Sequence, residues 1–305
     1  MKKTLALTLA LLMALALFAA CDKAPPTEDP IETTVDVNTP LSDGKTLKVL
    51  AIGNSFSNNT TKYLYDIAKA QGATDIAIGR LYISGCSLQA HVSNAESNAP
   101  AYEYSKNTDG NWNSINSATL LYALQDENWD IITLQQNSGN SGKADTFNPS
   151  LELLIDYVNK NKTNPNARLV WNMTWAYQTG STQSGFAGYN NDQMTMYKAI
   201  LDAVQTTIIP NKNIAGVIPV GTAVQNARTS FIGDNLTRDT YHLNELGCVL
   251  GGYTWYTYFI GQPLETVNLE SIPGQPITEQ ERAVIKEAVN AALETPYAIT
   301  ESANK

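Results

Sequence analysis

A short apolar run from Lys48 to Ile52, stopped by Gly53 and followed by Asn54 and Ser55, constrains the fold more than any other stretch. A β-type run bounded by a glycine is typical of a buried strand, and residues 60–71 then show helical spacing. Ser55 is therefore predicted to lie at the carboxyl end of a strand. Open α/β sheets bind their ligands at that edge.

The same alternation of strand and helix continues along the chain. Further strand-like runs and helical patterns occupy 75–83, 129–139, 151–159, 167–173, 194–208, 214–220 and the tail, where Thr278 and Glu281 form a capping box. The alternation predicts an α/β fold, a three-layer α/β/α sandwich around a central, mainly parallel sheet. Residues 94–117 and 178–192 lack clear periodicity, and an insertion or long loop is expected at 94–117.

The chain is predicted to have a signal, a tether and one domain. Residues 1–20 pair two lysines with an apolar run, typical of a secretion signal. The run ends in Phe-Ala-Ala-Cys, which resembles a bacterial lipoprotein signal in which Cys21 carries the lipid, and ordinary cleavage with a free Cys21 is the alternative. Proline-rich residues 21–45 are expected to be a flexible tether, and residues 46–305 a single domain. This organisation predicts a protein lipid-anchored to the bacterial cell envelope.

Composition argues against several classes of partner. The net charge is −9 and lysine and arginine do not cluster, so nucleic acid is not an expected partner. The chain has only two histidines, too few for a Cys/His metal site, and no cofactor is expected. Besides Cys21, the chain has Cys86 and Cys248, which could pair or both be buried, and their spacing does not decide between the two.

The predicted strand ends carry the parts of a nucleophilic site. Ser55 follows the first strand, Gly85 the second and the amides Gln135, Gln136 and Asn137 the third. Backbone N–H groups of Ser55 and Gly85, with one of these amides, could surround an oxyanion.

A base for the serine comes from a later segment. In the sequence Asp239-x-x-His242, a single turn can place the Asp239 carboxylate against one imidazole nitrogen. The other nitrogen then faces outward and can take the proton of the serine. In isolation, each of these short motifs is more often a turn than a catalytic element. Their joint occurrence in this order favours a serine hydrolase.

Five motifs resemble those of the SGNH (GDSL-like) hydrolase superfamily, in particular a poorly characterised bacterial lipoprotein branch. They are Gly-Asn-Ser-Phe at 53–56, Gly-Cys-Ser-Leu at 85–88, Leu-Gln-Gln-Asn-Ser at 134–138, Thr-Trp-Ala-Tyr at 174–177 and Arg-Asp-Thr-Tyr-His-Leu at 238–243. The resemblance implies an SGNH/flavodoxin-like sandwich with Ser55 as nucleophile, His242 as base and Asp239 as its orienting partner. Many relatives deacylate carbohydrates.

The third block departs from the superfamily pattern Gly-x-Asn-Asp, so the identity of its oxyanion donor is open. Relatives with a glutamine near this point favour Gln135 or Gln136 over Asn137. His91 and Trp175 are candidate substrate-binding residues. For His91, a position on the surface is an equally open explanation. For Trp175, packing under a loop is the commoner explanation.

The predicted function is hydrolysis of acyl esters, acetyl above all, on an extracellular carbohydrate or another small ester. The alternative is a non-catalytic, glycan-binding lipoprotein on the same scaffold. This alternative is motivated by the altered third block, by Trp175 and Tyr177, and by the expected insertion from Tyr102 to Trp112, which contains tyrosine and tryptophan.

Overall fold

The computed structural model describes residues 40–305. The predicted signal, the lipid site Cys21 and most of the predicted tether lie outside the described residues. The first strand begins at Thr46. Within residues 40–305, no helix has the length and apolar character needed to cross a membrane.

A seven-stranded sheet in the order β4-β3-β2-β1-β5-β6-β7 forms the centre of the fold. Its strands are β1 (Thr46–Gly53), β2 (Asp75–Tyr82), β3 (Tyr102–Asn107), β4 (Trp112–Ala118), β5 (Ile131–Leu134), β6 (Arg168–Asn172) and β7 (Val217–Ile218). The five strands from β2 to β7 in this order run parallel, and β3 and β4 add an antiparallel edge. The predicted α/β class with a mainly parallel sheet is confirmed.

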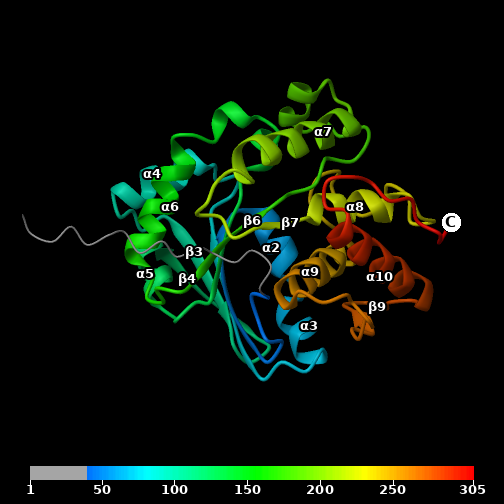
Figure 1. Cartoon of the computed structure of the whole chain (residues 1–305), viewed down its shortest axis with the longest axis horizontal. Helices are drawn as coiled ribbons and strands as arrows, with labels where there is room; N and C mark the ends of the chain where they lie inside the picture. Colours follow the sequence, from blue (N-terminus) through cyan, green and yellow to red (C-terminus); the bar gives the residue numbers. More distant parts are fainter. Residues whose placement is uncertain (1–39) are drawn as a thin grey trace, which may run out of the picture. The chain divides into compact units, whose positions relative to one another are not determined.

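Helices cover both faces of the sheet, as Figure 1 shows. One layer holds α2 (Ser55–Thr61), α3 (Leu64–Ala70), α8 (Val220–Arg228), α9 (Glu245–Ile260) and α10 (Glu279–Glu294), and the other holds α4 (Leu88–Glu96), α5 (Leu120–Gln125), α6 (Ser150–Asn161) and α7 (Gln193–Ala203). Short helical segments complete the fold: the 3-10 helices η1 (Ser138–Asn140), η2 (Ala144–Thr146) and η3 (Ser184–Tyr189), and the π-helical segment η4 (Val204–Ile208). A small separate hairpin is formed by β8 (Ser271–Ile272) and β9 (Gln275–Pro276). The predicted capping box of Thr278 and Glu281 begins α10.

The expected insertion or long loop at 94–117 is wrong in its detail. This stretch holds the end of α4 and the antiparallel hairpin β3–β4, which extends the sheet beyond β2. Most of β4 is exposed, and its sequence, Trp-Asn-Ser-Ile-Asn-Ser-Ala, has polar residues on both faces and no apolar alternation. An edge strand that buries neither face lacks the alternating apolar pattern by which strands are recognised.

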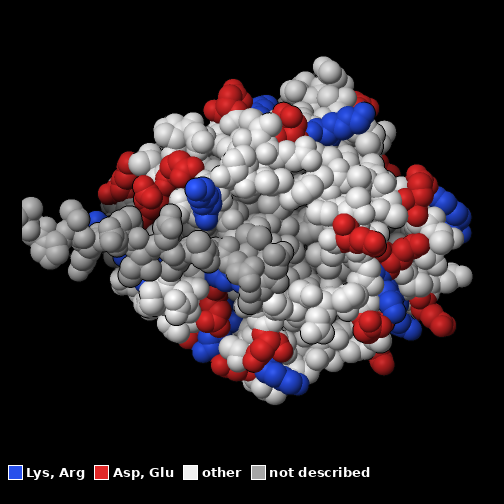
Figure 2. All heavy atoms as spheres, in the orientation of Figure 1, with Lys and Arg blue, Asp and Glu red and all other residues white. Residues whose placement is uncertain are grey.

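The surface carries scattered charge. On the face drawn in Figure 2, lysine and arginine atoms lie singly among acidic ones, without a continuous basic area. This distribution agrees with the acidic net charge of the sequence.

Candidate active site

Ser55 is the first residue of α2, directly after the turn that ends β1. Asn54 caps the helix, because its Oδ1 accepts a hydrogen bond from the Phe56 N–H at 3.0 Å. The turn requires glycine at 53, since a Cβ there would lie 2.6 Å from the Ser57 Oγ. The N–H of Ser55 belongs to the first helical turn, where backbone donors have no partner within the helix.

The structure brings Ser55 together with His242 and Asp239, two neighbouring residues of a much later segment. The Ser55 Oγ lies 2.8 Å from the His242 Nε2, and the His242 Nδ1 lies 2.7 Å from the Asp239 Oδ2. The other Asp239 oxygen accepts the backbone N–H of His242 at 2.8 Å. Burial alone would raise the pKa of Asp239, but the hydrogen bonds from His242 and the charge of its imidazolium form hold this pKa below its usual value.

The turn between Asp239 and His242 is backbone-strained. Thr240 has a φ of 73°, in the left-handed region that a β-branched residue rarely adopts. Its hydroxyl lies 2.8 Å from the Ser181 Oγ, and its carbonyl accepts the N–H of Gln178. Contacts with the loop after β6 therefore hold this turn in the conformation that places His242 beside Ser55.

Trp175 packs against the turn between Asp239 and His242 and does not form a surface on which a sugar could stack. Its ring is fully buried and stacks on Phe56, and its indole N–H donates to the carbonyl of Tyr241 at 2.8 Å. Tyr177 is buried as well, with its hydroxyl 2.8 Å from the Ser138 Oγ. The prediction of Trp175 as a substrate-binding residue is wrong, because no face of the ring is open to a ligand.

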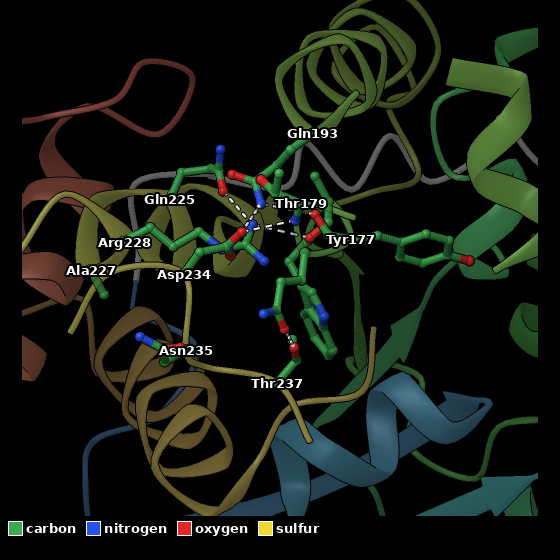
Figure 3. Close-up of polar contacts among 12 residues, drawn as sticks. Tyr177, Thr179, Gln193, Gln225, Ala227, Arg228, Asp234, Asn235 and Thr237 are labelled. Carbon is green, nitrogen blue, oxygen red and sulfur yellow. Dashed lines mark hydrogen bonds and ion pairs between the residues drawn. The ribbon is translucent and has the colours of Figure 1, made fainter. Parts of the chain in front are cut away.

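An ion pair between the buried Arg228 and the half-buried Asp234 links the loop after β6 to the 229–244 loop, and Figure 3 shows the pair. The Arg228 Nε lies 2.8 Å from the Asp234 Oδ1, and the Arg228 Nη1 donates to the carbonyl of Ala176 at 3.1 Å. Asp234 also accepts the N–H of Thr179 and the side-chain amide of Gln193. Burial lowers the pKa of Arg228 to about 10, and Asp234 opposes that shift.

This pair was not predicted from the sequence. Arg228 ends α8, and Asp234 lies in the 229–244 loop that carries Asp239 and His242. Neither residue belongs to a recognisable motif, and only the folded chain places them together. The pair joins the loop after β6 to the loop that carries the candidate base.

The second strand end carries Gly85, a predicted backbone donor. Gly85 is exposed and has a φ of 62°, a conformation that glycine adopts without strain. Its carbonyl accepts the side-chain amide of Asn137 at 3.2 Å. Asn137 is half-buried, so the third block contributes this amide to the edge at which Ser55 and Gly85 lie.

Gln135 and Gln136, the predicted oxyanion donors, are both buried and engaged elsewhere. The Gln135 amide donates to the Asn54 Oδ1 at 2.9 Å and accepts from Asn172 at 2.8 Å. The Gln136 amide donates to Thr146, and its oxygen accepts the N–H groups of Leu88 and Asn137. Their carboxamides hold the strand ends in place below the surface, so the prediction that they are donors is contradicted.

His91 does not line the site or the surface. It is buried on α4, where its Nδ1 lies 3.0 Å from the Tyr102 hydroxyl, and burial lowers its pKa to about 4. The two open alternatives for the cysteines are also resolved, because Cys86 and Cys248 are buried and both thiols are free. Burial raises the pKa of each thiol to about 12, which disfavours the reactive thiolate. Among residues 40–305, no cluster of His, Cys, Asp and Glu could hold a metal ion.

Two solved structures are distant likenesses of the chain. A protein described as a GDSL-like lipase from Parabacteroides merdae is 12% identical with a TM-score of 0.48, over 73% of this chain and 100% of the lipase. A family 3 carbohydrate esterase from Clostridium thermocellum is 17% identical with a TM-score of 0.43, over 71% and 96% of the two chains.

A much nearer relative is the crystal structure of a DUF4886 family protein from Bacteroides uniformis. It is 40% identical with a TM-score of 0.79, and the alignment covers 84% of this chain and 98% of that protein. No curated protein matches the sequence. The model of the domain of unknown function DUF4886 matches residues 48–292. The chain therefore belongs to the DUF4886 family.

Proposed function

We propose that this protein is a serine esterase that removes acyl groups, acetyl above all, from an extracellular carbohydrate. The observation that carries the proposal is the continuous hydrogen-bonded chain from the Ser55 Oγ through His242 to Asp239. It is the arrangement by which an imidazole activates a hydroxyl, and the SGNH-like motifs of the sequence supply the same three residues. Anchoring to the cell envelope through a lipid on Cys21 is a further part of the proposal, supported by the sequence alone.

The reaction follows from this geometry. The His242 Nε2 takes the proton of the Ser55 hydroxyl as the Oγ forms a bond to the carbonyl carbon of the ester. The carbonyl oxygen becomes an oxyanion, and His242 passes its proton to the leaving alcohol as the ester C–O bond breaks. Water then attacks the acyl-serine by the same route, releasing the carboxylic acid and the free Ser55. Asp239 holds the imidazole in the required tautomer and stabilises its protonated form.

The oxyanion is stabilised by the backbone N–H groups of Ser55 and Gly85 and by the Asn137 side chain. Asn137 replaces Gln135 and Gln136 in this role because it is the third-block amide that reaches Gly85. One N–H of its Nδ2 bonds the Gly85 carbonyl, and the second is available to a substrate oxygen. A single donor of this kind is typically worth about 3–4 kcal/mol of barrier.

Hydrolysis of p-nitrophenyl acetate and of acetylated xylo-oligosaccharides tests the proposal. The wild type is expected to hydrolyse both, and Ser55→Ala and His242→Ala to lower kcat by about 10³-fold or more. Ser93→Ala removes an exposed serine of α4 and is the matched control. Full activity in the Ser55 and His242 variants would refute the proposed machinery.

The alternative, a glycan-binding protein without turnover, loses the support of Trp175 and Tyr177. Trp175 and Tyr177 are buried beneath the loops, so these two rings are not a stacking surface for sugars.

A further inference from the structure

The ring of Tyr241 lies against the ring of the candidate base that follows it in the chain. The centroids of the Tyr241 and His242 rings are 4.0 Å apart, and the two planes are inclined by 40°. Most aromatic pairs in proteins have their centroids about 4.5–7 Å apart. An edge-on approach would keep the centroids at such distances, so the face of the Tyr241 ring is turned toward the imidazole.

The strained turn before His242 makes this contact possible. In an extended segment, successive side chains point to opposite sides of the chain. The φ of 73° at Thr240 bends the backbone just before Tyr241, and the next two rings face each other. The carbonyl of Tyr241 accepts the indole N–H of Trp175 at 2.8 Å, and its ring meets the Tyr177 ring edge-on, with centroids 5.7 Å apart. Both contacts hold Tyr241 in place beside the imidazole.

The imidazole of His242 lies in surroundings that disfavour a positive charge. Its side chain is only 15% exposed, and the centroid of the buried Phe56 ring lies 5.8 Å from that of the imidazole. In the part of the chain that the structure describes, Asp239 is the one carboxylate paired with His242. Asp239 also accepts the backbone N–H groups of Tyr241 and His242 and lies 4.0 Å from the Arg238 Nε. Its negative charge is therefore shared among several donors.

The other described groups in contact with the imidazole carry no formal charge. Helix α2 contributes Ser55 and Phe56, and the loop after β6 contributes Tyr177 through its contact with Tyr241. The face of a tyrosine ring attracts a cation, and the attraction is stronger where the cation is shielded from water. Besides Asp239, the Tyr241 ring is therefore the group that is placed to stabilise a protonated His242.

We propose that the Tyr241 ring stabilises the imidazolium form of His242 by a cation–π interaction, which makes Tyr241 a positioning residue of the active site. The proposal rests on the proposed function, since the imidazolium forms when His242 takes the proton of Ser55. A contact that strengthens as this proton moves favours the transition state over the ground state.

NMR titration of the His242 imidazole in the intact protein tests the proposal without turnover. The chain has one other histidine, His91, so the spectrum of His91→Gln assigns the two Cε1–H signals. Tyr241→Leu keeps an apolar side chain but lacks the ring face, and its His242 midpoint is expected at least about 0.5 pH unit below that of the wild type. Tyr241→Phe is expected to keep the wild-type midpoint, because the ring remains. Equal midpoints in the wild type and Tyr241→Leu would overturn the proposal.

A fluorinated ring separates the effect of the ring face from packing. Replacement of Tyr241 by 3,4,5-trifluorophenylalanine keeps an aromatic ring of similar shape and removes most of the negative charge from its face. Its His242 midpoint is expected below that of Tyr241→Phe, and equal midpoints in these two proteins would overturn the proposal even if Tyr241→Leu fails to fold. Tyr122→Leu removes an exposed tyrosine of α5 and is the matched control, with the midpoint of the wild type.

Hydrolysis of p-nitrophenyl acetate across a range of pH gives the catalytic readout. In Tyr241→Leu, the acid limb of kcat/KM is expected to move to lower pH by the same amount, and kcat at the plateau to fall about threefold or more with KM unchanged. Tyr241→Phe is expected to show neither change. A loss of activity without movement of the acid limb would mean that Tyr241 has only a packing role.

The two experiments separate this proposal from the proposed function. A lowered His242 midpoint in Tyr241→Leu, in a protein that hydrolyses no ester, would support the contact between ring and imidazolium and refute the esterase. Ester hydrolysis by the wild type, with equal midpoints in all the Tyr241 variants, would refute the role of Tyr241 and leave the esterase standing.

Discussion

The ring of Trp175 stacks on the ring of Phe56, with centroids 4.2 Å apart and planes inclined by 12°. Phe56 follows the candidate nucleophile directly, and the indole N–H of Trp175 donates to Tyr241, the residue before the candidate base. One buried side chain therefore contacts the segments that carry both partners of the Ser55–His242 hydrogen bond.

Trp175→Phe is expected to keep the stacking and lose the hydrogen bond to Tyr241. The free energy of unfolding should fall by about 1–3 kcal/mol, because the part-buried Tyr241 carbonyl is left unpaired. Because the turn that holds His242 then loosens, kcat should fall as well. Urea unfolding and ester hydrolysis measure the two effects.

The matched control is Trp129→Phe. Trp129 is a buried indole that donates to the carbonyl of Ala123, in another part of the fold. A similar loss of stability with unchanged kcat is expected. If Trp175→Phe also leaves kcat unchanged, Trp175 is only a core residue.

Asn137→Ala and Gln135→Ala are expected to have opposite effects. Asn137→Ala should lower kcat by about 10²-fold or more with little change in stability, since it removes an oxyanion donor. Gln135→Ala should lower the free energy of unfolding by about 1–3 kcal/mol, because the side chains of Asn54 and Asn172 each lose a buried partner. Thermal unfolding and steady-state kinetics on both variants measure the contrast. A reversed pattern would return the oxyanion role to Gln135.

Asp234→Ala is expected to destabilise the protein by about 3 kcal/mol, because the Arg228 guanidinium, 5% exposed, loses its counter-charge. The double variant Arg228→Met with Asp234→Ala should be more stable than Asp234→Ala alone, since no unpaired charge remains buried. Urea unfolding of the wild type, Arg228→Met, Asp234→Ala and the double variant completes the cycle. Additive losses would mean that the two residues act independently.

His91 is expected to make stability depend on pH in a defined window. The unfolded chain binds a proton on this imidazole below about pH 6.5, but the folded protein does so only near pH 4. The unfolded state therefore binds more protons between these values, and stability falls as the pH is lowered through the window, by at most about 1.4 kcal/mol per unit. His91→Gln, which can still bond Tyr102, should flatten the slope of unfolding free energy against pH.

The control for this prediction is His242→Gln. His242 is the other histidine of the chain, so a slope that comes from His91 should persist in this variant. A slope that His91→Gln leaves intact would show that other groups cause it.

Much of the fold could be predicted because the parallel strands are buried on both faces. The run before Gly53 is apolar throughout, and its burial in β1 gives a strong pattern. The hairpin β3–β4 was not recognised because its outer strand is exposed and polar. A pattern of burial can reveal only the strands that bury side chains.

The geometry of the candidate site was predictable where residue chemistry is distinctive. The chain has only two histidines, and His242 follows Asp239 in a short motif, so few candidate bases exist for Ser55. The structure places these three residues within hydrogen-bond distance. The side chains of Gln135 and Trp175 were misplaced because a strand end has an inner and an outer side. The sequence does not show on which side a residue following the strand points.

The central claim is that His242 activates Ser55 as a nucleophile. Its most direct test is labelling of the folded protein with a fluorophosphonate probe, followed by mass spectrometry of the peptide that contains Ser55. We expect a single adduct on Ser55 in the wild type, none in Ser55→Ala and labelling slowed by about 10³-fold or more in His242→Gln. An unlabelled wild-type Ser55, or labelling as fast in His242→Gln, would contradict the claim.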